Sequence, residues 1–271
     1  MSPTLPRAAR LPINRCNLPA VILGSLTYQQ HPVPLKLDGV EDLHHGLFAL
    51  LDGLADAGTR AQAFMAHMDA AFSLTHPEEA GYSAAAPLGR AKANYLKVLR
   101  GWAFDADGRE GAVLKGWVES RFGLLPRHHG GPIRDFSEPT YRLYLEQRSG
   151  GLYNTNSLEA QLDLLYCYCQ SELARRWPGA NHLTLYRGIN RMGDYEVLEE
   201  TDRCHRVVLL NSLNSFTLER ERACEFGDTI LEARVPLPKV FFFHRLLPGK
   251  LSGEEEFGVI GGVYEVSCSI L

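Results

Sequence analysis

The spacing of apolar residues changes near residue 180, and this change limits the folds available to the chain. Before it, two stretches have leucines at three- and four-residue steps, which is the spacing of one helix face: Leu43, Leu47, Leu50, Leu51 and Leu54, then Leu158, Leu162, Leu165 and Leu173. After it, β-branched and aromatic residues form short runs broken by Gly, Pro and Asn, as strands do. The sequence therefore predicts an α+β protein, with a helical N-terminal part packed on a mostly antiparallel β core.

We expect the helical part to span residues 1–180 and a strand-rich core to span 181–271, the two forming one compact unit. The expected strands cover 183–186, 207–210, 229–235, 240–244, 257–260 and 263–267, with a helical insert at 219–226. The glycines between the last two runs, Gly261 and Gly262, predict a hairpin turn. Asn156 followed by Glu159 predicts a capping box at a helix start.

Charge and composition argue against several classes of partner. The chain has 28 basic and 32 acidic residues, so there is no cationic excess to hold nucleic acid. The longest apolar run near the start, residues 18–26, is about half of a membrane span, and the segment before it lacks the order of a secretory signal. Six cysteines form no C-x-x-C pair. We therefore expect a soluble cytoplasmic protein.

The motifs for metals and phosphates are weak. Residues 105–108 (Asp-Ala-Asp-Gly) begin like a calcium loop but lack its later glutamate, so we expect a plain turn. The pairs His44–His45 and His128–His129 are adjacent residues, which point about 100° apart on a helix and do not converge on one ion. We expect surface or capping histidines and no metal site. No phosphate-binding loop or nucleophile elbow is present in the sequence.

Three segments of the strand-rich half carry more chemistry. Arg187-Gly188 ends an apolar strand; arginine suits a diphosphate and glycine permits close approach, although a solvated turn would look the same. Ser215-Phe216-Thr217 offers two hydroxyls and an aromatic ring, which could orient a ligand or cap the next helix.

The third segment is a run of three carboxylates before an apolar strand. Strand alternation would place Glu254 and Glu256 on one face and Glu255 on the other, and a one-residue slip would pair different carboxylates. An acidic loop explains the run equally well. Paired carboxylates beside a buried strand also suit a reaction that develops positive charge on a sugar.

In this order, an arginine, a serine segment and Glu-x-Glu before a strand resemble the arginine-directed ADP-ribosyltransferases. Arg187, Ser215 and Glu256 lie 28 and 41 residues apart, which suits that fold. The helical first half and the Leu-Asn-Ser-Phe-Thr segment resemble, more narrowly, the dinitrogenase reductase ADP-ribosyltransferases. Many relatives have Ser-Thr-Ser where this chain has Ser215-Phe216-Thr217, so the serine role carries over only to Ser215.

The resemblance implies a mono-ADP-ribosyltransferase that moves ADP-ribose from NAD to an arginine of the nitrogenase iron protein. Glu256 would stabilise the oxocarbenium ion, Ser215 would orient Glu256, and Glu254 would take the proton of the acceptor guanidinium. Residues 187, 188 and 215–217 would bind NAD, and residues 244–253 would contact the acceptor protein. A PII-type nitrogen-signalling protein would be the regulator.

Two other functions stay open on the sequence. An NAD glycohydrolase would use water in place of arginine, which Glu254 argues against. A non-catalytic regulatory module on the same fold is the other, and the intact set of Arg187, Ser215 and Glu256 argues against it.

Overall fold

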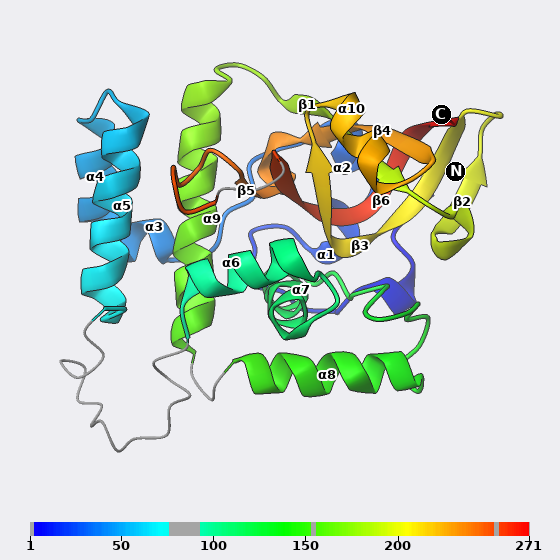
Figure 1. Cartoon of the computed structure of the whole chain (residues 1–271), viewed down its shortest axis with the longest axis horizontal. Coiled ribbons are helices and arrows are strands. Elements are labelled where there is room, and N and C mark those ends of the chain that lie inside the picture. The colour runs from blue at the N-terminus through cyan, green and yellow to red at the C-terminus, as the bar shows by residue number, and fades with distance from the viewer. Residues whose placement is uncertain (1–2, 76–92, 153–155, 252–254, 271) are drawn as a thin grey trace.

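A computed structural model describes residues 3–75, 93–152, 156–251 and 255–270. In these ranges helices come first and strands follow, which confirms the α+β prediction (Figure 1). The helices are α1 (Ala20–Leu23), α2 (Leu26–Gln30), α3 (Val40–Leu43), α4 (His45–Asp52), α5 (Ala57–Phe72), α6 (Tyr95–Phe104), α7 (Arg109–Phe122), α8 (Pro139–Gly151), α9 (Ser157–Arg176) and α10 (Arg220–Ala223).

The described strands form one antiparallel sheet in the order β2-β3-β1-β4-β6-β5. Because β3 also pairs with β6, the strands β3, β1, β4 and β6 close into a ring of neighbours. The strand bounds are β1 (His182–Ile189), β2 (Glu196–Glu200), β3 (His205–Thr217), β4 (Thr229–Pro236), β5 (Val240–Phe243) and β6 (Glu256–Ile270).

The predicted hairpin at Gly261 and Gly262 is wrong, because β6 runs through both glycines. The glycines permit close contacts inside the strand. A Cβ at Gly261 would lie 1.8 Å from the carbonyl oxygen of Asn211, where β3 bulges between Leu210 and Leu213. Gly262 has a φ of +120° and lies against Gly24, between α1 and α2. The same glycines that suggest a turn therefore allow other backbones to pack on a continuous strand.

The structure also contains one strand that the sequence does not predict and lacks one predicted helix cap. Strand β2 was not predicted, because its sequence Glu-Val-Leu-Glu-Glu is mostly polar and lies at the sheet edge with no buried residue. The predicted capping box is wrong as well, since the Asn156 side chain makes no cap hydrogen bond to α9.

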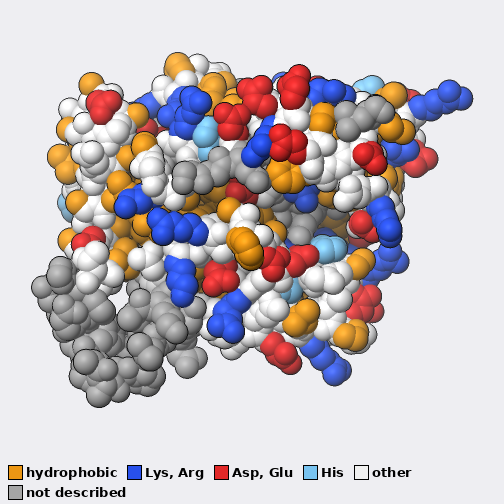
Figure 2. All heavy atoms as spheres, viewed as in Figure 1, with side chains coloured by type: hydrophobic (Ala, Val, Ile, Leu, Met, Phe, Trp, Pro, Cys, Tyr) orange, Lys and Arg blue, Asp and Glu red, His pale blue; other side chains and the backbone are white. Residues whose placement is uncertain are grey.

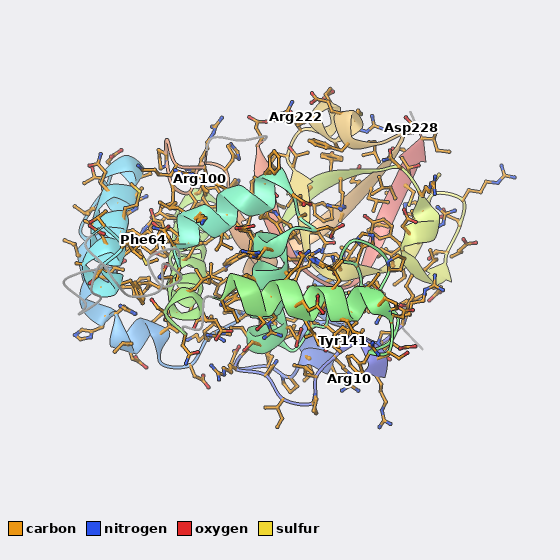
Figure 3. The ribbon with its side chains drawn as sticks, turned by 60° about the horizontal axis from the view of Figure 1, so that its bottom comes forward. Arg10, Phe64, Arg100, Tyr141, Arg222 and Asp228 are labelled. Atoms are coloured by element: carbon orange, nitrogen blue, oxygen red, sulfur yellow. The ribbon has the colours of Figure 1, made fainter. Side chains whose placement is uncertain are left out.

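One large hydrophobic core joins the helices to the sheet. The ring of Trp117 on α7 stacks on that of Phe241 on β5, with centroids 4.3 Å apart. Gln170 on α9 donates to the carbonyl oxygen of Val240 at 2.7 Å. Figure 1 shows α6, α7 and α8 on one side of the sheet, and Figure 3 shows this layer from another side, with Arg100 on α6 and Tyr141 on α8 labelled. Within the described ranges, no helix combines the length and apolarity that crossing a bilayer requires.

Candidate functional site

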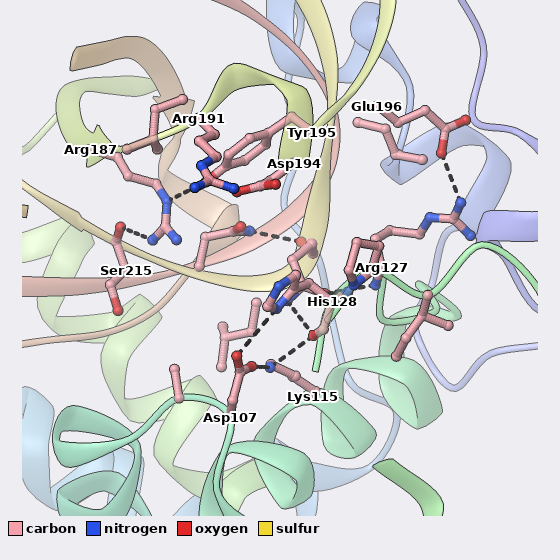
Figure 4. A pocket seen from close by; sticks show the side chains of 18 of the residues that line it. Asp107, Lys115, Arg127, His128, Arg187, Arg191, Asp194, Tyr195, Glu196 and Ser215 are labelled. Carbon is pink, nitrogen blue, oxygen red and sulfur yellow. Dashed lines mark hydrogen bonds and ion pairs between the residues drawn. The ribbon is translucent and has the colours of Figure 1, made fainter. Parts of the chain in front are cut away.

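A cleft lies between the sheet and the layer of α6 and α7 (Figure 4). It contains a cavity of about 700 Å³ and, beside it, a second cavity of about 580 Å³. Both cavities are lined by Arg187, Gly188 and Ser215 from the strands and by Trp102 from α6. We call β1, β3 and β6 the strand wall, and α6, α7 and residues 105–108 and 127–134 the helical wall.

Strand register brings the predicted residues of the strand wall together. Strand β3 lies between β1 and β6, where Thr217 is opposite both Tyr186 and Glu256. Arg187 is next to Tyr186, and Ser215 is two residues before Thr217, so its side chain projects from the same face of β3. Residues from three separate strands thus meet at one end of the strand wall.

Hydrogen bonds connect these residues in a series. The Ser215 hydroxyl donates to Glu256 Oε1. Arg187 Nη1 donates to the carbonyl oxygen of Ser215 at 2.7 Å, and Arg187 Nε donates to the Tyr195 hydroxyl at 3.0 Å. The Arg187 guanidinium is therefore held by hydrogen bonds to two neighbours (Figure 4). Tyr195 was not predicted, because it follows the strand in a short 3-10 turn that carries no motif.

Glu256 has another partner from the helical wall, which the sequence did not reveal. The indole Nε1 of Trp102 donates to Glu256 Oε1 at 2.6 Å. Trp102 lies near the end of α6 and is only 3% exposed. A single tryptophan in a helix gives no sequence signal of such a contact, since the apolar face of α6 reads as ordinary core.

The other predicted NAD-binding residues, Gly188, Phe216 and Thr217, also have structural contacts within the protein. A Cβ at Gly188 would lie 2.0 Å from the carbonyl oxygen of Ala223, so the glycine is needed for packing against α10. Phe216 is 2% exposed and belongs to the hydrophobic core, although it borders the smaller cavity. Thr217 Oγ1 accepts from the backbone N–H of Glu219 at 3.2 Å, and the start of α10 at Glu219 has no side-chain cap.

Glu255 does not continue the alternation of β6. Strand β6 begins at Glu256, and Glu255 has a left-handed backbone with φ of +53°, so the opposite-face rule does not reach back across it. Glu255 Oε1 lies 4.0 Å from Arg245 Nη2. Glu254 lies outside the described residues.

The helical wall contains a buried polar cluster. Lys115 Nζ on α7 donates to Asp107 Oδ1 at 2.7 Å and to the carbonyl oxygen of His128 at 2.9 Å. Burial lowers the pKa of Lys115, and the charge of Asp107 opposes that shift only in part. Burial raises the pKa of Asp107, but the contacts with His128 and Lys115 outweigh it and hold this pKa well below its usual range. The expected plain turn at 105–108 therefore carries an ion pair.

Asn211 holds the loop after α7 on the sheet. Its Oδ1 accepts from the backbone N–H of Arg127 at 2.8 Å, and its Nδ2 donates to the carbonyl oxygen of His128 at 3.0 Å.

The expectation of a surface or capping histidine is wrong for His129, which is fully buried with Nε2 2.9 Å from Gln147 Oε1. Groups of three or more potential metal ligands are not found in the described part of the chain. Figure 2 shows Lys, Arg, Asp and Glu intermixed over the visible face rather than one patch of a single sign.

Comparison with known proteins agrees with the resemblance that the motifs suggest. The sequence profile described as dinitrogenase reductase ADP-ribosyltransferase (DRAT) matches residues 13–268. The chain is 41% identical to NAD(+)--dinitrogen-reductase ADP-D-ribosyltransferase of Rhodospirillum rubrum over 262 residues, which are 95% of each protein. No solved structure matches the chain significantly.

Proposed function

Since the chain belongs to the dinitrogenase reductase ADP-ribosyltransferase family, we propose that it transfers ADP-ribose from NAD to an arginine of the nitrogenase iron protein and so inactivates nitrogen fixation. The observation that carries this proposal is the hydrogen-bonded series of Arg187, Ser215 and Glu256 along one end of the strand wall. These are the three residues to which the family resemblance assigns NAD binding and catalysis.

NAD is the substrate that donates ADP-ribose, and the cleft suits it in size and charge. Its two adjoining cavities, of about 700 and 580 Å³, fall in the range of small-molecule pockets. Arg187 lines both, and its guanidinium is held by Ser215 and Tyr195. A planar cation held in this way is suited to the NAD diphosphate. Gly188, Phe216 and Thr217 border the same space and would contact the rest of NAD.

The first chemical step needs stabilisation of charge rather than a general acid. The bond between the ribose C1′ and the nicotinamide nitrogen breaks, and its electron pair neutralises the cationic ring. Positive charge then develops on the ribose. A carboxylate near that ribose is worth more in the transition state than in the ground state, and Glu256 supplies it while Ser215 fixes its orientation.

In the second step a guanidinium nitrogen of the acceptor forms the new bond to C1′ and loses one proton. A guanidinium with a pKa above about 12 is a poor nucleophile until a carboxylate accepts that proton. We assign this role to Glu254. Nicotinamide release to water and labelling of the iron protein, measured in parallel for Glu254→Gln and Glu255→Gln, test the assignment. Glu254→Gln should lose labelling and keep slow nicotinamide release, and the assignment fails if Glu255→Gln alone abolishes labelling.

One assay separates transferase from the two alternatives. The protein is incubated with NAD labelled in its adenylate part and with purified iron protein. Label on the iron protein, located on an arginine by mass spectrometry, supports the proposal. Free ADP-ribose without labelled protein would make the chain an NAD glycohydrolase, and neither product would make it a binding module.

Regulation and location complete the proposal. From the family resemblance we assign recognition of a PII-type nitrogen-signalling protein to the helical half, and we place the protein in the cytoplasm. Size-exclusion chromatography of the chain with a purified PII-type protein tests the first point. Separate elution at micromolar concentration, with and without NAD, would contradict it.

A further inference from the structure

The helical wall reaches the reacting end of the cleft through one side chain. Trp102 on α6 donates its indole N–H to Glu256 Oε1 at 2.6 Å, and this is the oxygen to which the Ser215 hydroxyl also donates. The two donors come from opposite walls of the cleft. The strand wall thus supplies only part of the hydrogen-bond network around the Glu256 carboxylate, and α6 supplies another part.

The two donors constrain the carboxylate differently. A serine hydroxyl rotates about its Cβ–Oγ bond and can donate in several directions, whereas an indole N–H points in one direction fixed by a rigid ring. A glutamate has several rotatable bonds, so it keeps a working geometry only if its neighbours hold it there. The Trp102 indole therefore supplies a directional restraint that Ser215 does not.

Trp102 is itself held firmly. A Cβ at Gly101 would lie 2.4 Å from Glu110 Cγ, so this glycine lets α6 lie close against α7 next to Trp102. Lys115 Nζ lies 6.0 Å from the centre of the Trp102 ring, a cation–π distance. At the start of α6, the backbone N–H of Tyr95 donates to Gln161 Oε1 of α9 at 2.9 Å. The indole donor is thus part of a packed helical framework.

We propose that Trp102 is a positioning residue for ADP-ribose transfer, whose N–H holds the Glu256 carboxylate in the orientation that stabilises the ribose cation. The proposal rests on the proposed role of Glu256. It makes α6, but not the rest of the helical wall, part of the catalytic apparatus, since displacement of α6 would release the Glu256 carboxylate without changing any residue of the strand wall.

Trp102→Phe tests the proposal, with Trp117→Phe as the matched control. Trp117 is also a buried tryptophan of the helical half, and its Nε1 donates to the Asp163 carboxylate at 2.7 Å, outside the cleft. The kcat of nicotinamide release should fall about 10- to 100-fold in Trp102→Phe, as expected for losing a hydrogen bond to a charged group. The KM for NAD should stay nearly constant. Trp117→Phe should lower Tm and leave kcat close to that of the unaltered protein.

Two further variants separate positioning from packing. In a Glu256→Gln background, adding Trp102→Phe should change the residual kcat very little, because the charge to be positioned is already gone. Site-specific replacement of Trp102 by benzothienylalanine keeps the ring shape and removes only the donor, so it should reproduce the kcat loss even if the Phe variant folds poorly. An unchanged kcat with this analogue, or a rise in KM alone, overturns the proposal. If Glu256→Gln itself left kcat unchanged, the role of Glu256 would be wrong instead.

Discussion

The strand wall and the helical wall of the cleft hold their functional side chains by different means. Arg187, Ser215 and Glu256 of the strand wall occupy neighbouring strands whose backbone pairing fixes their spacing. Trp102 and Lys115 of the helical wall occupy separate helices, and side-chain packing together with an ion pair fixes their positions. Changes on the strand wall should therefore affect chemistry at little cost in stability. Changes on the helical wall should reduce stability, and they should affect chemistry as well only at Trp102, which contacts Glu256.

The largest effect should come from Glu256→Gln on the strand wall. It keeps the size of the side chain and removes its charge, and the loss of one electrostatic group facing a developing charge typically lowers rates about 100-fold or more. NAD affinity and Tm should change little, because the strand pairing of β6 is unaffected. Initial rates of iron-protein labelling measure the loss. Glu265→Gln, at an exposed position of the same strand, is the control, and equal rates in the two variants would remove Glu256 from the mechanism.

The difference between the walls also explains what the sequence could predict. Apolar runs locate β1, the first part of β3 and, as two separate runs, β6. The family motif then selects Arg187, Ser215 and Glu256 next to these runs, and strand register brings them near one another. The Trp102 contact depends on how α6 packs against α7 and the sheet, which no local pattern specifies.

The remaining errors have the same origin. Gly261 and Gly262 look like a turn until the close approach of Asn211 and Gly24 is known. His129 looks like a surface residue until the loop after α7 is seen to fold over Lys115 and Gln147. In each case the sequence shows the residue type, and a distant segment decides its environment.

On the helical wall, Lys115→Met should mainly reduce stability. Removal of the cation takes one donor from Asp107, which keeps His128, and one from the His128 carbonyl oxygen, which keeps Asn211. Losing one partner of a buried pair costs several kcal/mol, and because Asp107 is about a third exposed and both groups keep another contact, we expect about 2 kcal/mol. Urea unfolding measures the change, with exposed Lys36→Met as the control. A rate loss as large as that of Glu256→Gln, with unchanged stability, would instead show that Lys115 belongs to the chemistry.

A smaller effect on the strand wall is expected for Arg187→Lys. The charge remains, but a lysine cannot reproduce the contacts of Arg187 Nη1 and Nε with Ser215 and Tyr195 or offer paired donors to a diphosphate. NAD affinity should fall about 10-fold, the loss of roughly one hydrogen bond to a charged group. Calorimetric titration with NAD measures it. Arg220→Lys is the control, since this arginine donates to Ser269 on the exposed surface, and unchanged affinity in Arg187→Lys would return Arg187 to a structural role.

The comparison extends to a second buried lysine behind the strand wall. Lys239 is 2% exposed, and its Nζ donates to the carbonyl oxygen of Gly261 in β6 at 2.5 Å. Its charge lies 5.6 Å from the ring centre of Tyr28 and 6.0 Å from that of Tyr264. Lys115 has Asp107 as its counter-ion, whereas no carboxylate within the described ranges pairs with Lys239. Burial lowers the pKa of Lys239 to about 7.

This lowered pKa predicts the smallest effect, a pH-dependent difference between the unaltered protein and Lys239→Met. Between pH 7 and pH 10 the unfolded chain keeps the proton on Lys239 while the folded chain has released it, so the free energy of unfolding rises with pH. The contribution of Lys239 should approach about 1.4 kcal/mol per pH unit and should be absent from Lys239→Met. Urea unfolding of both proteins at pH 7 and pH 8 under reducing conditions measures it. Burial raises the pKa of the Cys16 thiol, which interacts with the Lys239 charge, so between pH 7 and pH 8 this thiol stays protonated in both proteins and the difference between them isolates Lys239. Parallel pH profiles would mean that Lys239 stays protonated in the folded protein, held by the Gly261 carbonyl oxygen and the rings of Tyr28 and Tyr264. The sheet would then hold a buried lysine cation without a carboxylate, whereas the helical wall holds Lys115 with Asp107.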